Sequence, residues 1–239
     1  MSTPVYDVIA LPYAVEMTAV TFGALSGALH ATRRGLDPVG VFVIALCCAV
    51  GGGLIRDVLL QTGVPLALRS PEYLSIAALA SVIGIVFARG VRAALPVIGV
   101  VDTLLIGVWV LLGAERALLI DLTFSAAVFL GVLTATGGGL VRDLLCREVP
   151  SVVKPGEWYA AAAILASLVF VALIAAGASL LVAEVVTVVV ATLARAGSLR
   201  FGWRTPTAYD LWGDLEPRVA AGLDRMRSLG DDRLRRRTS

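Results

Sequence analysis

Charged residues are scarce in this sequence. Only 16% of the 239 residues are Asp, Glu, Lys or Arg, whereas 58% are hydrophobic and the mean hydropathy is +0.89. Soluble domains carry about 25% charged residues, so this shortage excludes an ordinary soluble domain and predicts an integral membrane protein. A nucleic-acid partner would require a basic face on a soluble module, which only the C-terminal tail could supply, and none is predicted.

Cysteine and histidine are also rare. Cys47, Cys48 and Cys146 lie in apolar stretches without CxxC spacing, and no acidic or histidine cluster in the sequence accompanies them. The spacing therefore predicts no metal site, and the thiols are expected to face lipid or to pack. His30 is the sole histidine and lies near a predicted membrane boundary, so we interpret it as incidental rather than as a pH sensor.

Enzyme motifs are missing as well. The sequence has no GxSxG, no HExxH and no Walker lysine after a glycine loop, so neither an enzyme nor a cofactor is predicted. No basic region precedes the first apolar run, which starts near Pro12, so we expect no cleavable signal peptide. That first segment is expected to remain as a transmembrane helix.

Long apolar segments are what the chain has in abundance. A helix needs about 20 apolar residues to cross the hydrocarbon, and seven segments come close to this length. The fold class predicted is an all-α membrane protein with seven transmembrane helices, within a membrane domain of residues 1–199. The predicted spans are 12–32, 39–61, 72–88, 94–113, 122–145, 157–176 and 179–197.

Turn-forming and polar residues mark the ends of these segments. Asp37-Pro38 starts the second, because proline suits a first helical turn. The stretch from Gly113 to Arg116 is expected to close the fourth. Only Gly177-Ala178-Ser179 separates the sixth from the seventh, which predicts a tight hairpin.

One glycine-rich phrase occurs twice. The first copy, GGGLIRDVLL, begins at Gly51, and the second copy, GGGLVRDLL, begins 86 positions later at Gly137. Three successive glycines are poor helix formers, and an adjacent Arg-Asp pair is expensive to insert into lipid. A costly feature present in duplicate marks the place where function is expected.

The duplication extends beyond this phrase. Glu16 corresponds to Asp102 at the same offset, so residues 12–90 and 98–176 are two copies of one three-span unit. Because three is odd, the second copy enters the membrane from the opposite side, and the two repeats are predicted to be inverted. The seventh helix, 179–197, lies outside the duplication.

The basic residues of the loops predict the orientation. One side carries six of them and the other only two, and the richer side, shared with the Arg-rich C-terminus, is predicted to be cytoplasmic. The protein is thus expected in the cell (inner) membrane with its N-terminus outside. Residues 200–239 form a cytoplasmic tail, in which apolar residues at helical spacing from Leu211 to Met226 indicate a short amphipathic helix. The six are Arg33, Arg34, Arg89, Arg92, Arg147 and Lys154, and the two are Arg69 and Arg116.

The glycines are expected about midway through the bilayer. A helix with three consecutive glycines can kink or partly unwind there, and exposed backbone groups are tolerated only against protein or water. Two such helices meeting from opposite sides would form a path for an ion or solute. The alternative is close helix packing, which glycine also permits. The positions concerned are Gly51, Gly52, Gly53, Gly137, Gly138 and Gly139.

Several charges fall within the predicted spans. Arg56 and Glu16 are candidates for an ion pair, and Arg142 and Asp102 repeat the arrangement. These pairs either gate a permeation path or merely lock the helices by neutralising one another.

The remaining acids leave alternatives open. Asp57 and Asp143 are expected to point away from their arginine neighbours and to cap a cavity or bond to a facing helix. Glu184, alone in the seventh span, is either a partner for one of the arginines or a contact between subunits.

The two phrases, the acid in the first helix of each repeat and the 3+3+1 span count together resemble the prokaryotic branch of the trimeric intracellular cation channel (TRIC) family, also described as the bacterial glycine-transporter-like or UPF0126 family. The resemblance covers residues 12 to about 197. It implies a homotrimer with a potassium-permeable pore in each subunit, lined by the kinked second and fifth helices. It places the kinks at Gly51–Gly53 and Gly137–Gly139 and the pore charges at Arg56, Asp57, Arg142 and Asp143. Glu16, Asp102 and Glu184 are predicted from the sequence itself to be supporting buried acids.

Three functions are therefore weighed. The first is a passive channel for monovalent cations, with potassium or sodium as the permeant ion and membrane lipids as the surroundings. The second is a secondary transporter of a small solute such as glycine, because bacterial relatives with this phrase have been described so. The third is an assembly scaffold without transport.

Overall fold

The computed structural model describes residues 13–87 and 95–207. Within these ranges the regular elements are helical, apart from one isolated bridge between Glu157 and Arg204. In chain order the elements are α1 (Tyr13–Arg33), α2 (Pro38–Leu60), α3 (Leu66–Arg69), α4 (Pro71–Val86), α6 (Leu95–Leu119), α7 (Phe124–Leu145), the 3-10 turn η1 (Ser151–Val153), α8 (Ala160–Ala175) and α9 (Leu180–Phe201).

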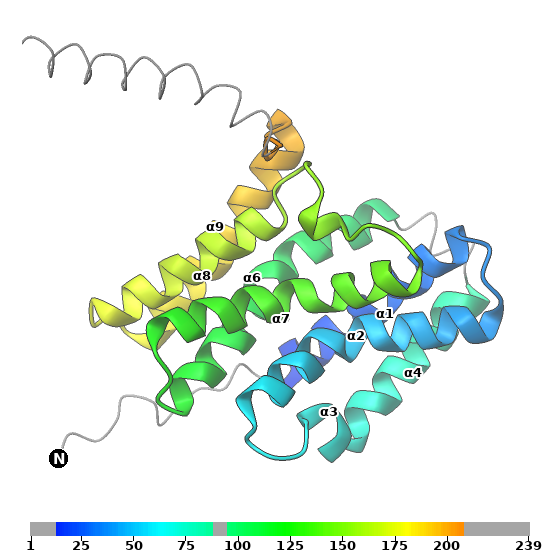
Figure 1. Cartoon of the computed structure of the whole chain (residues 1–239), viewed down its shortest axis with the longest axis horizontal. Coiled ribbons are helices and arrows are strands. Elements are labelled where there is room, and N and C mark those ends of the chain that lie inside the picture. Colours follow the sequence, from blue (N-terminus) through cyan, green and yellow to red (C-terminus); the bar gives the residue numbers. More distant parts are fainter. Residues whose placement is uncertain (1–12, 88–94, 208–239) are drawn as a thin grey trace, which may run out of the picture.

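The helices form two groups that meet at α2 and α7. In the first group α1 packs on both α2 and α4, and in the second α6 packs on both α7 and α8. The two groups are joined mainly by α2 lying against α7 at the centre of the molecule (Figure 1). The remaining helix, α9, covers α8 and α6 on the outer side of the second group.

Each group has its own apolar core built largely from small residues. Val20 on α1, Ala49 on α2 and Ala77 on α4 belong to the first core. Leu111 on α6 and Phe170 on α8 belong to the second. Alanine at so many contacts lets the helix backbones approach closely, as is typical of helix packing in membranes.

Local sequence explains where several helices begin and end. Asp37 caps α2 by accepting a hydrogen bond from the backbone N–H of Gly40 at 2.7 Å, and Pro38 occupies the first turn. Gly177 has a φ of +78° between α8 and α9, a conformation that glycine adopts without strain. The predicted start of the second helix and the tight hairpin are both confirmed.

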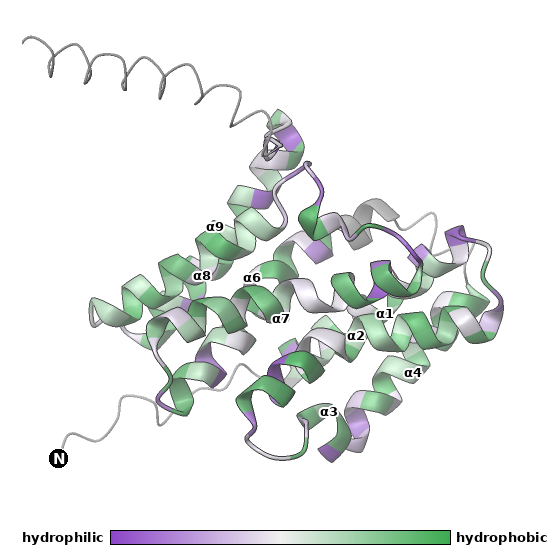
Figure 2. Ribbon diagram, in the orientation of Figure 1, coloured by the Kyte–Doolittle hydropathy of each residue, from purple (hydrophilic) through white to green (hydrophobic). Residues whose placement is uncertain are grey.

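The outer faces of the helices are apolar. Figure 2 shows hydrophobic residues along most of the helical surface, with polar residues concentrated at helix ends and in loops. Large side chains such as Val39, Leu79 and Phe129 are exposed, as expected for a surface in contact with lipid. By length and hydropathy, α2, α7 and α9 are each sufficient to cross a membrane, and the protein is an all-helical membrane protein.

Helices α6 and α8 differ most in length from their predicted spans, and α9 ends at Phe201 rather than at residue 197. We expected the fourth span to end near Gly113, but α6 continues to Leu119. The helix is held there by packing: a Cβ at Gly113 would meet the Leu130 carbonyl oxygen of α7, and Arg116, expected in a loop, pairs with Glu16.

The other difference concerns the sixth span, predicted from residue 157. Helix α8 begins only at Ala160, because the backbone before it bonds to the segment after α9. The backbones of Glu157 and Arg204 form an isolated β-bridge, and the Thr205 N–H donates to the Gly156 carbonyl at 2.9 Å. With 16 residues, α4 and α8 are each about 24 Å long, short of the hydrocarbon thickness of about 30 Å.

Two predictions concern residues outside the described ranges. The basic loop containing Arg89 and Arg92 falls in residues 88–94, and the amphipathic helix of the tail falls in residues 208–239.

Candidate functional site

The glycine phrases form the crossing between α2 and α7. A Cβ at Gly52 would meet the carbonyl oxygen of Thr134, and a Cβ at Gly138 would meet the carbonyl oxygen of Cys48. The two contacts are equivalent, since Gly138 and Thr134 stand 86 positions after Gly52 and Cys48. Only glycine permits backbones this close, so these glycines serve helix packing.

The third glycine of each phrase has a different environment. A Cβ added at Gly53 would lie 3.7 Å from the Nη2 atom of Arg56, and one added at Gly139 would lie 3.8 Å from the Nη2 atom of Arg142, with no other atom within 4 Å in either case. These two glycines therefore leave room beside a guanidinium group rather than at the helix contact.

Both helices are continuous through their glycines. The unwinding considered from the sequence is therefore not observed in α2 or α7, and bends at the glycines stay a prediction. Gly51 and Gly137 are buried at the crossing, where a Cβ on Gly137 would lie 2.9 Å from the Cα of Gly52.

Each arginine of the phrases binds the aspartate that follows it. Arg56 Nε donates to Asp57 Oδ1 at 2.8 Å, and Arg142 Nε donates to Asp143 Oδ1 at 2.8 Å. The expected pairs of Arg56 with Glu16 and of Arg142 with Asp102 are not the ones formed, and the aspartates do not point away from their neighbours. Consecutive residues point about 100° apart around a helix, but the arginine side chain is long enough to reach the aspartate that follows it.

The second oxygen of each aspartate holds the loop that follows. Asp57 Oδ2 accepts the backbone N–H of Leu66, and Asp143 Oδ2 accepts that of Ser151, both at 2.8 Å. These bonds place α3 and η1 next to the arginines. Each Arg-Asp pair thus fixes the segment after its helix.

The other predicted acids are not paired with the arginines of the phrases. Glu16 pairs with Arg116 at 3.1 Å instead of Arg56. Glu184 is 6% exposed and lies beside Glu115 on α6, so it is already buried within one subunit. No arginine within the described ranges pairs with Glu184, so the first of its two predicted roles is not observed, and a contact between subunits stays a prediction.

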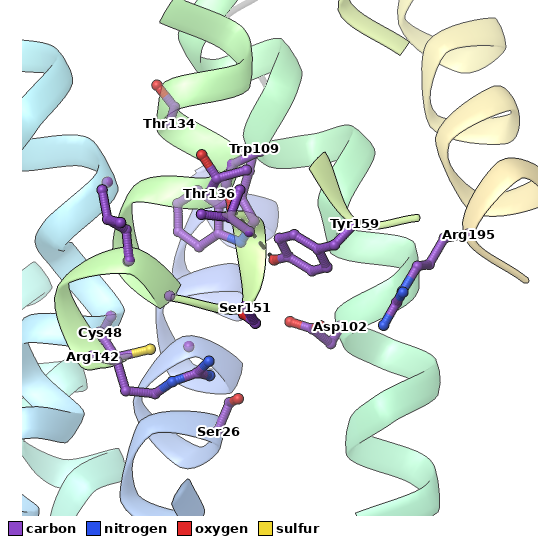
Figure 3. A pocket seen from close by; sticks show the side chains of 18 residues that line it. Ser26, Cys48, Asp102, Trp109, Thr134, Thr136, Arg142, Ser151, Tyr159 and Arg195 are labelled. Atoms are coloured by element: carbon purple, nitrogen blue, oxygen red, sulfur yellow. Dashed lines mark hydrogen bonds between the residues drawn. The ribbon is translucent and has the colours of Figure 1, made fainter. Parts of the chain in front are cut away.

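A polar cavity of about 190 Å³ adjoins the helix crossing. Its walls include Gly52, Gly138 and Gly139 and the side chains of Arg142 and Asp102. The cavity is large enough for several water molecules, which polar walls would hold. Figure 3 shows the Arg142 side chain near Cys48 and Ser26, and Asp102 beside Arg195 on another wall.

Several lining residues were not singled out from the sequence. They are Trp109 on α6, Tyr159 before α8, Arg195 on α9 and Ser151 on η1. The Tyr159 hydroxyl donates to the Ala135 carbonyl at 3.4 Å, and its ring lies under the Arg195 guanidinium, 5.5 Å from the ring centre. Arg195 could have been found by its charge within an apolar segment, whereas nothing in the sequence distinguishes Trp109.

Among the described residues, this central cavity belongs to a series of four cavities in which each shares lining residues with the next. A vestibule of about 370 Å³ near Lys154 shares Ser151, Tyr159 and Arg195 with it. On its other side, a cavity of only about 20 Å³ shares Ala49 and Trp109 with it.

The fourth cavity completes the series. It holds about 180 Å³ near Thr62 and Arg69 and shares Asp57 and Leu66 with the small cavity. Neighbouring cavities thus share lining residues all the way from the loop after α7 to the loop after α2.

The smallest cavity of the series is lined by Arg56. Its side chain is 3% exposed, and Nη1 donates to the carbonyl oxygen of Leu112 at 3.2 Å. A volume of about 20 Å³ has room for roughly one water molecule. The equivalent Arg142 side chain is 17% exposed and faces the larger central cavity.

The fold and the cavities define a helical membrane protein with a polar interior. A family model described as a glycine transporter matches residues 13–89 and again residues 99–175. The chain therefore belongs to this family, whose curated bacterial relatives bear the designation UPF0126, and the family assignment made from the glycine phrases is confirmed.

Among these relatives, a UPF0126 membrane protein of Vibrio cholerae is 33% identical over 199 residues, which covers 83% of each chain. The UPF0126 inner membrane protein YadS of Escherichia coli is 34% identical over 200 residues, which covers 82% of this chain and 96% of YadS.

Solved structures with the same fold are TRIC channels. One studied for conductance through TRIC cation channels is 29% identical with a TM-score of 0.78, covering 83% of this chain and 97% of that one. The TRIC trimeric intracellular cation channel orthologue from Rhodobacter sphaeroides is 32% identical with a TM-score of 0.73, covering 80% of this chain and 97% of its own.

Proposed function

We propose that the protein is a channel for monovalent cations, permeable to potassium, with one pore in each subunit. The observation that carries this proposal is the series of four cavities, linked by shared lining residues, that passes beside the α2–α7 crossing. The similarity to structures of TRIC cation channels supports it.

The charges along the series suit a cation path that is closed in this conformation. Asp57 and Asp143 largely neutralise the two guanidinium groups, and Asp102 adds a carboxylate to the central cavity. At the constriction, Arg56 fills the space that an ion would need. We infer that the pore opens when Arg56 releases the Leu112 carbonyl. The guanidinium group thus acts as a gate, because its positive charge blocks the path until it moves aside.

The architecture proposed for this channel is seven membrane-crossing helices, with two inverted three-helix repeats and α9 as the extra helix. Two observations support the inversion: the family model matches the chain twice, and the contacts at the α2–α7 crossing are equivalent in pairs. We further propose bends at the two triple glycines. The proposed domain division keeps a membrane domain of residues 1–199 and a cytoplasmic tail of residues 200–239.

The proposed assembly is a homotrimer in the inner membrane. It is supported by the description of a similar structure as a trimeric channel and of a relative as an inner membrane protein. The N-terminus lies outside in this arrangement, and the partners are lipids, the permeant ions and two further copies of the chain.

Single-channel recording in planar bilayers tests the proposal. The purified protein is expected to give unitary currents that reverse at the potassium equilibrium potential.

Gly139→Leu should abolish these currents, because Gly139 lines the central cavity and a leucine would fill part of it without touching the helix contact. Gly35→Leu, in the exposed turn before α2, controls for the substitution of a glycine as such. Because Gly35 adopts a positive φ, this variant must first be shown to have the mass of a trimer. Electrical silence of the wild type, or normal currents from Gly139→Leu, would contradict the proposal.

The second candidate is a secondary transporter of a small zwitterion such as glycine. The description of the matched family favours it, and so does the central cavity, in which Arg142 and Asp102 offer partners for a carboxylate and an ammonium group. It predicts saturable uptake of radiolabelled glycine into proteoliposomes at rates far below those of a channel. Arg142→Ala should abolish this uptake, whereas a channel gives ion flux without saturable uptake.

A further inference from the structure

A cluster of three different ligand types lies outside the cavity series. Within the described ranges, His30 at the end of α1 meets Cys146 and Glu148, which follow α7. His30 Nε2 lies 3.0 Å from Glu148 Oε1, and all three ligand atoms lie within 4.8 Å of one another. The sequence alone could not show this, because His30 and Cys146 come from distant segments that only the fold brings together.

We propose that His30, Cys146 and Glu148 form a binding site for a borderline-soft divalent transition metal of the zinc class. An imidazole nitrogen, a thiolate and a carboxylate oxygen are the ligands that Zn²⁺ prefers, and a water molecule would complete a tetrahedron. Magnesium and calcium prefer sites made of oxygen alone, so this mixed set discriminates against them.

The present spacing is close to the one that such a metal needs. Ligand atoms around tetrahedral Zn²⁺ lie roughly 3.3–3.6 Å apart, given bond lengths of about 2.0–2.3 Å. The nitrogen and oxygen are slightly closer than this, and no pair exceeds 4.8 Å. Small side-chain rotations therefore suffice, without movement of the backbone.

Arg34 positions the carboxylate. Its Nη2 atom binds Glu148 Oε2 at 2.8 Å, which leaves Oε1 directed at His30. An outer partner of this kind orients a metal-binding carboxylate. The Arg34 side chain is 50% exposed, so its charge is well screened and opposes the bound metal only weakly.

The cluster is absent from the corresponding end of the first glycine phrase. At the offset of 86, Arg116 corresponds to His30 and Leu60 occupies the place of Cys146. The site is thus not a by-product of the duplication. It joins α1 to the segment between α7 and η1, and Ser151, the first residue of η1, lines both the central cavity and the vestibule. Metal binding would restrain that wall.

Titration of the purified full-length protein with Co²⁺ tests the site. Bound Co²⁺ should produce a sulfur-to-cobalt charge-transfer band and the intense d–d bands of a four-coordinate site. Cys146→Ser should remove the charge-transfer band, and Cys47→Ser should leave it unchanged. His30→Asn, which keeps the thiol, should weaken binding by at least about tenfold. A missing band at millimolar Co²⁺, or a band that survives Cys146→Ser, would overturn the proposal.

Thermal melting with Zn²⁺ supplies a second measurement. Zn²⁺ should raise the melting temperature of the wild type and of Cys47→Ser, because a ligand that binds only the folded state stabilises it. The shift should vanish in Cys146→Ser and in His30→Asn. An equal shift in all four proteins would mean that the metal binds elsewhere and would overturn the assignment. Neither measurement depends on transport, so either result leaves the channel proposal to its own test.

Discussion

Arg56 and Arg142 occupy equivalent places in the two glycine phrases, yet they have different surroundings. Both bind the following aspartate, but only Arg56 also donates to a helix carbonyl, that of Leu112. Burial of a guanidinium group is tolerated because its charge is paired and its N–H groups are bonded. The residue at the constriction is therefore held on two sides, and Arg142 on one.

Loss of the Arg56 charge should open the constriction. Replacing Arg56 alone would leave Asp57 with a buried, partly unpaired charge, so the double variant Arg56→Gln with Asp57→Asn is the appropriate one. We expect it to raise the open probability in planar bilayers by at least about tenfold, since about 1.4 kcal/mol of closed-state stabilisation corresponds to that factor.

The double variant Arg142→Gln with Asp143→Asn is the matched comparison. Arg142 lines the wider cavity, so its removal should alter the single-channel conductance more than the open probability. An unchanged open probability in the Arg56 double variant would show that this arginine is no gate.

Adjacent glycines in α7 should respond oppositely to substitution. A Cβ at Gly138 would clash with the Cys48 carbonyl oxygen, so Gly138→Ala should destabilise the protein by about 1–3 kcal/mol. At Gly139 the space is open, and alanine should be neutral or stabilising by up to about 1 kcal/mol through its helix propensity. Thermal unfolding in detergent measures both, and equal destabilisation would refute the division of roles.

At the scale of helices, the sequence predicted where helices form better than it predicted the residues at which they begin and end. Apolar length located the long helices, and Asp37-Pro38 and Gly177 located two boundaries, because these signals are local. The end of α6 and the start of α8 depend on partners distant in the sequence. Gly113 serves the contact with α7 rather than a helix end, and the backbone at Glu157 bonds to the segment after α9.

The same limit applies to the candidate site. The duplicated phrase identified the glycines and the charged residues that lie at the crossing. The predicted pairing of these charges was wrong. The Arg56 side chain is long enough to reach the carboxylate of its own neighbour, Asp57, and so does not pair with Glu16, which pairs with Arg116 instead. Tyr159 and Arg195 complete the cavity only through the packing of α8 and α9.

Ser198 fastens the end of α9 to the segment before α8. Its hydroxyl donates to the Trp203 carbonyl and accepts from the Trp158 N–H, both at 2.7 Å. Ser198→Ala removes both bonds and should destabilise the protein by about 1–3 kcal/mol. Thr192→Ala is the control, because its hydroxyl bonds only to the Val188 carbonyl of its own helix and its loss should stay within about 0.5 kcal/mol. Chemical unfolding in detergent compares them, and equal effects would contradict this role of Ser198.

At the scale of the whole molecule, the proposed orientation makes opposite predictions for two exposed positions. In a background with the native cysteines replaced by serine, Thr62→Cys should react with a membrane-impermeant maleimide on intact cells. Arg33→Cys should react only after the membrane is permeabilised. The reverse pattern would place the N-terminus inside and would reassign the vestibule near Lys154 to the outer face.

The unequal cavities on the two sides of the crossing have a consequence for current. An ion arriving from the vestibule passes two cavities of about 370 and 190 Å³ before it reaches the constriction at Arg56, whereas one arriving from the other end passes a single cavity of about 180 Å³. In the proposed channel the passage is therefore wider on one side of the constriction than on the other, and an asymmetric passage of this kind rectifies. With identical salt on both sides, the current at a given voltage should differ in magnitude when the polarity is reversed.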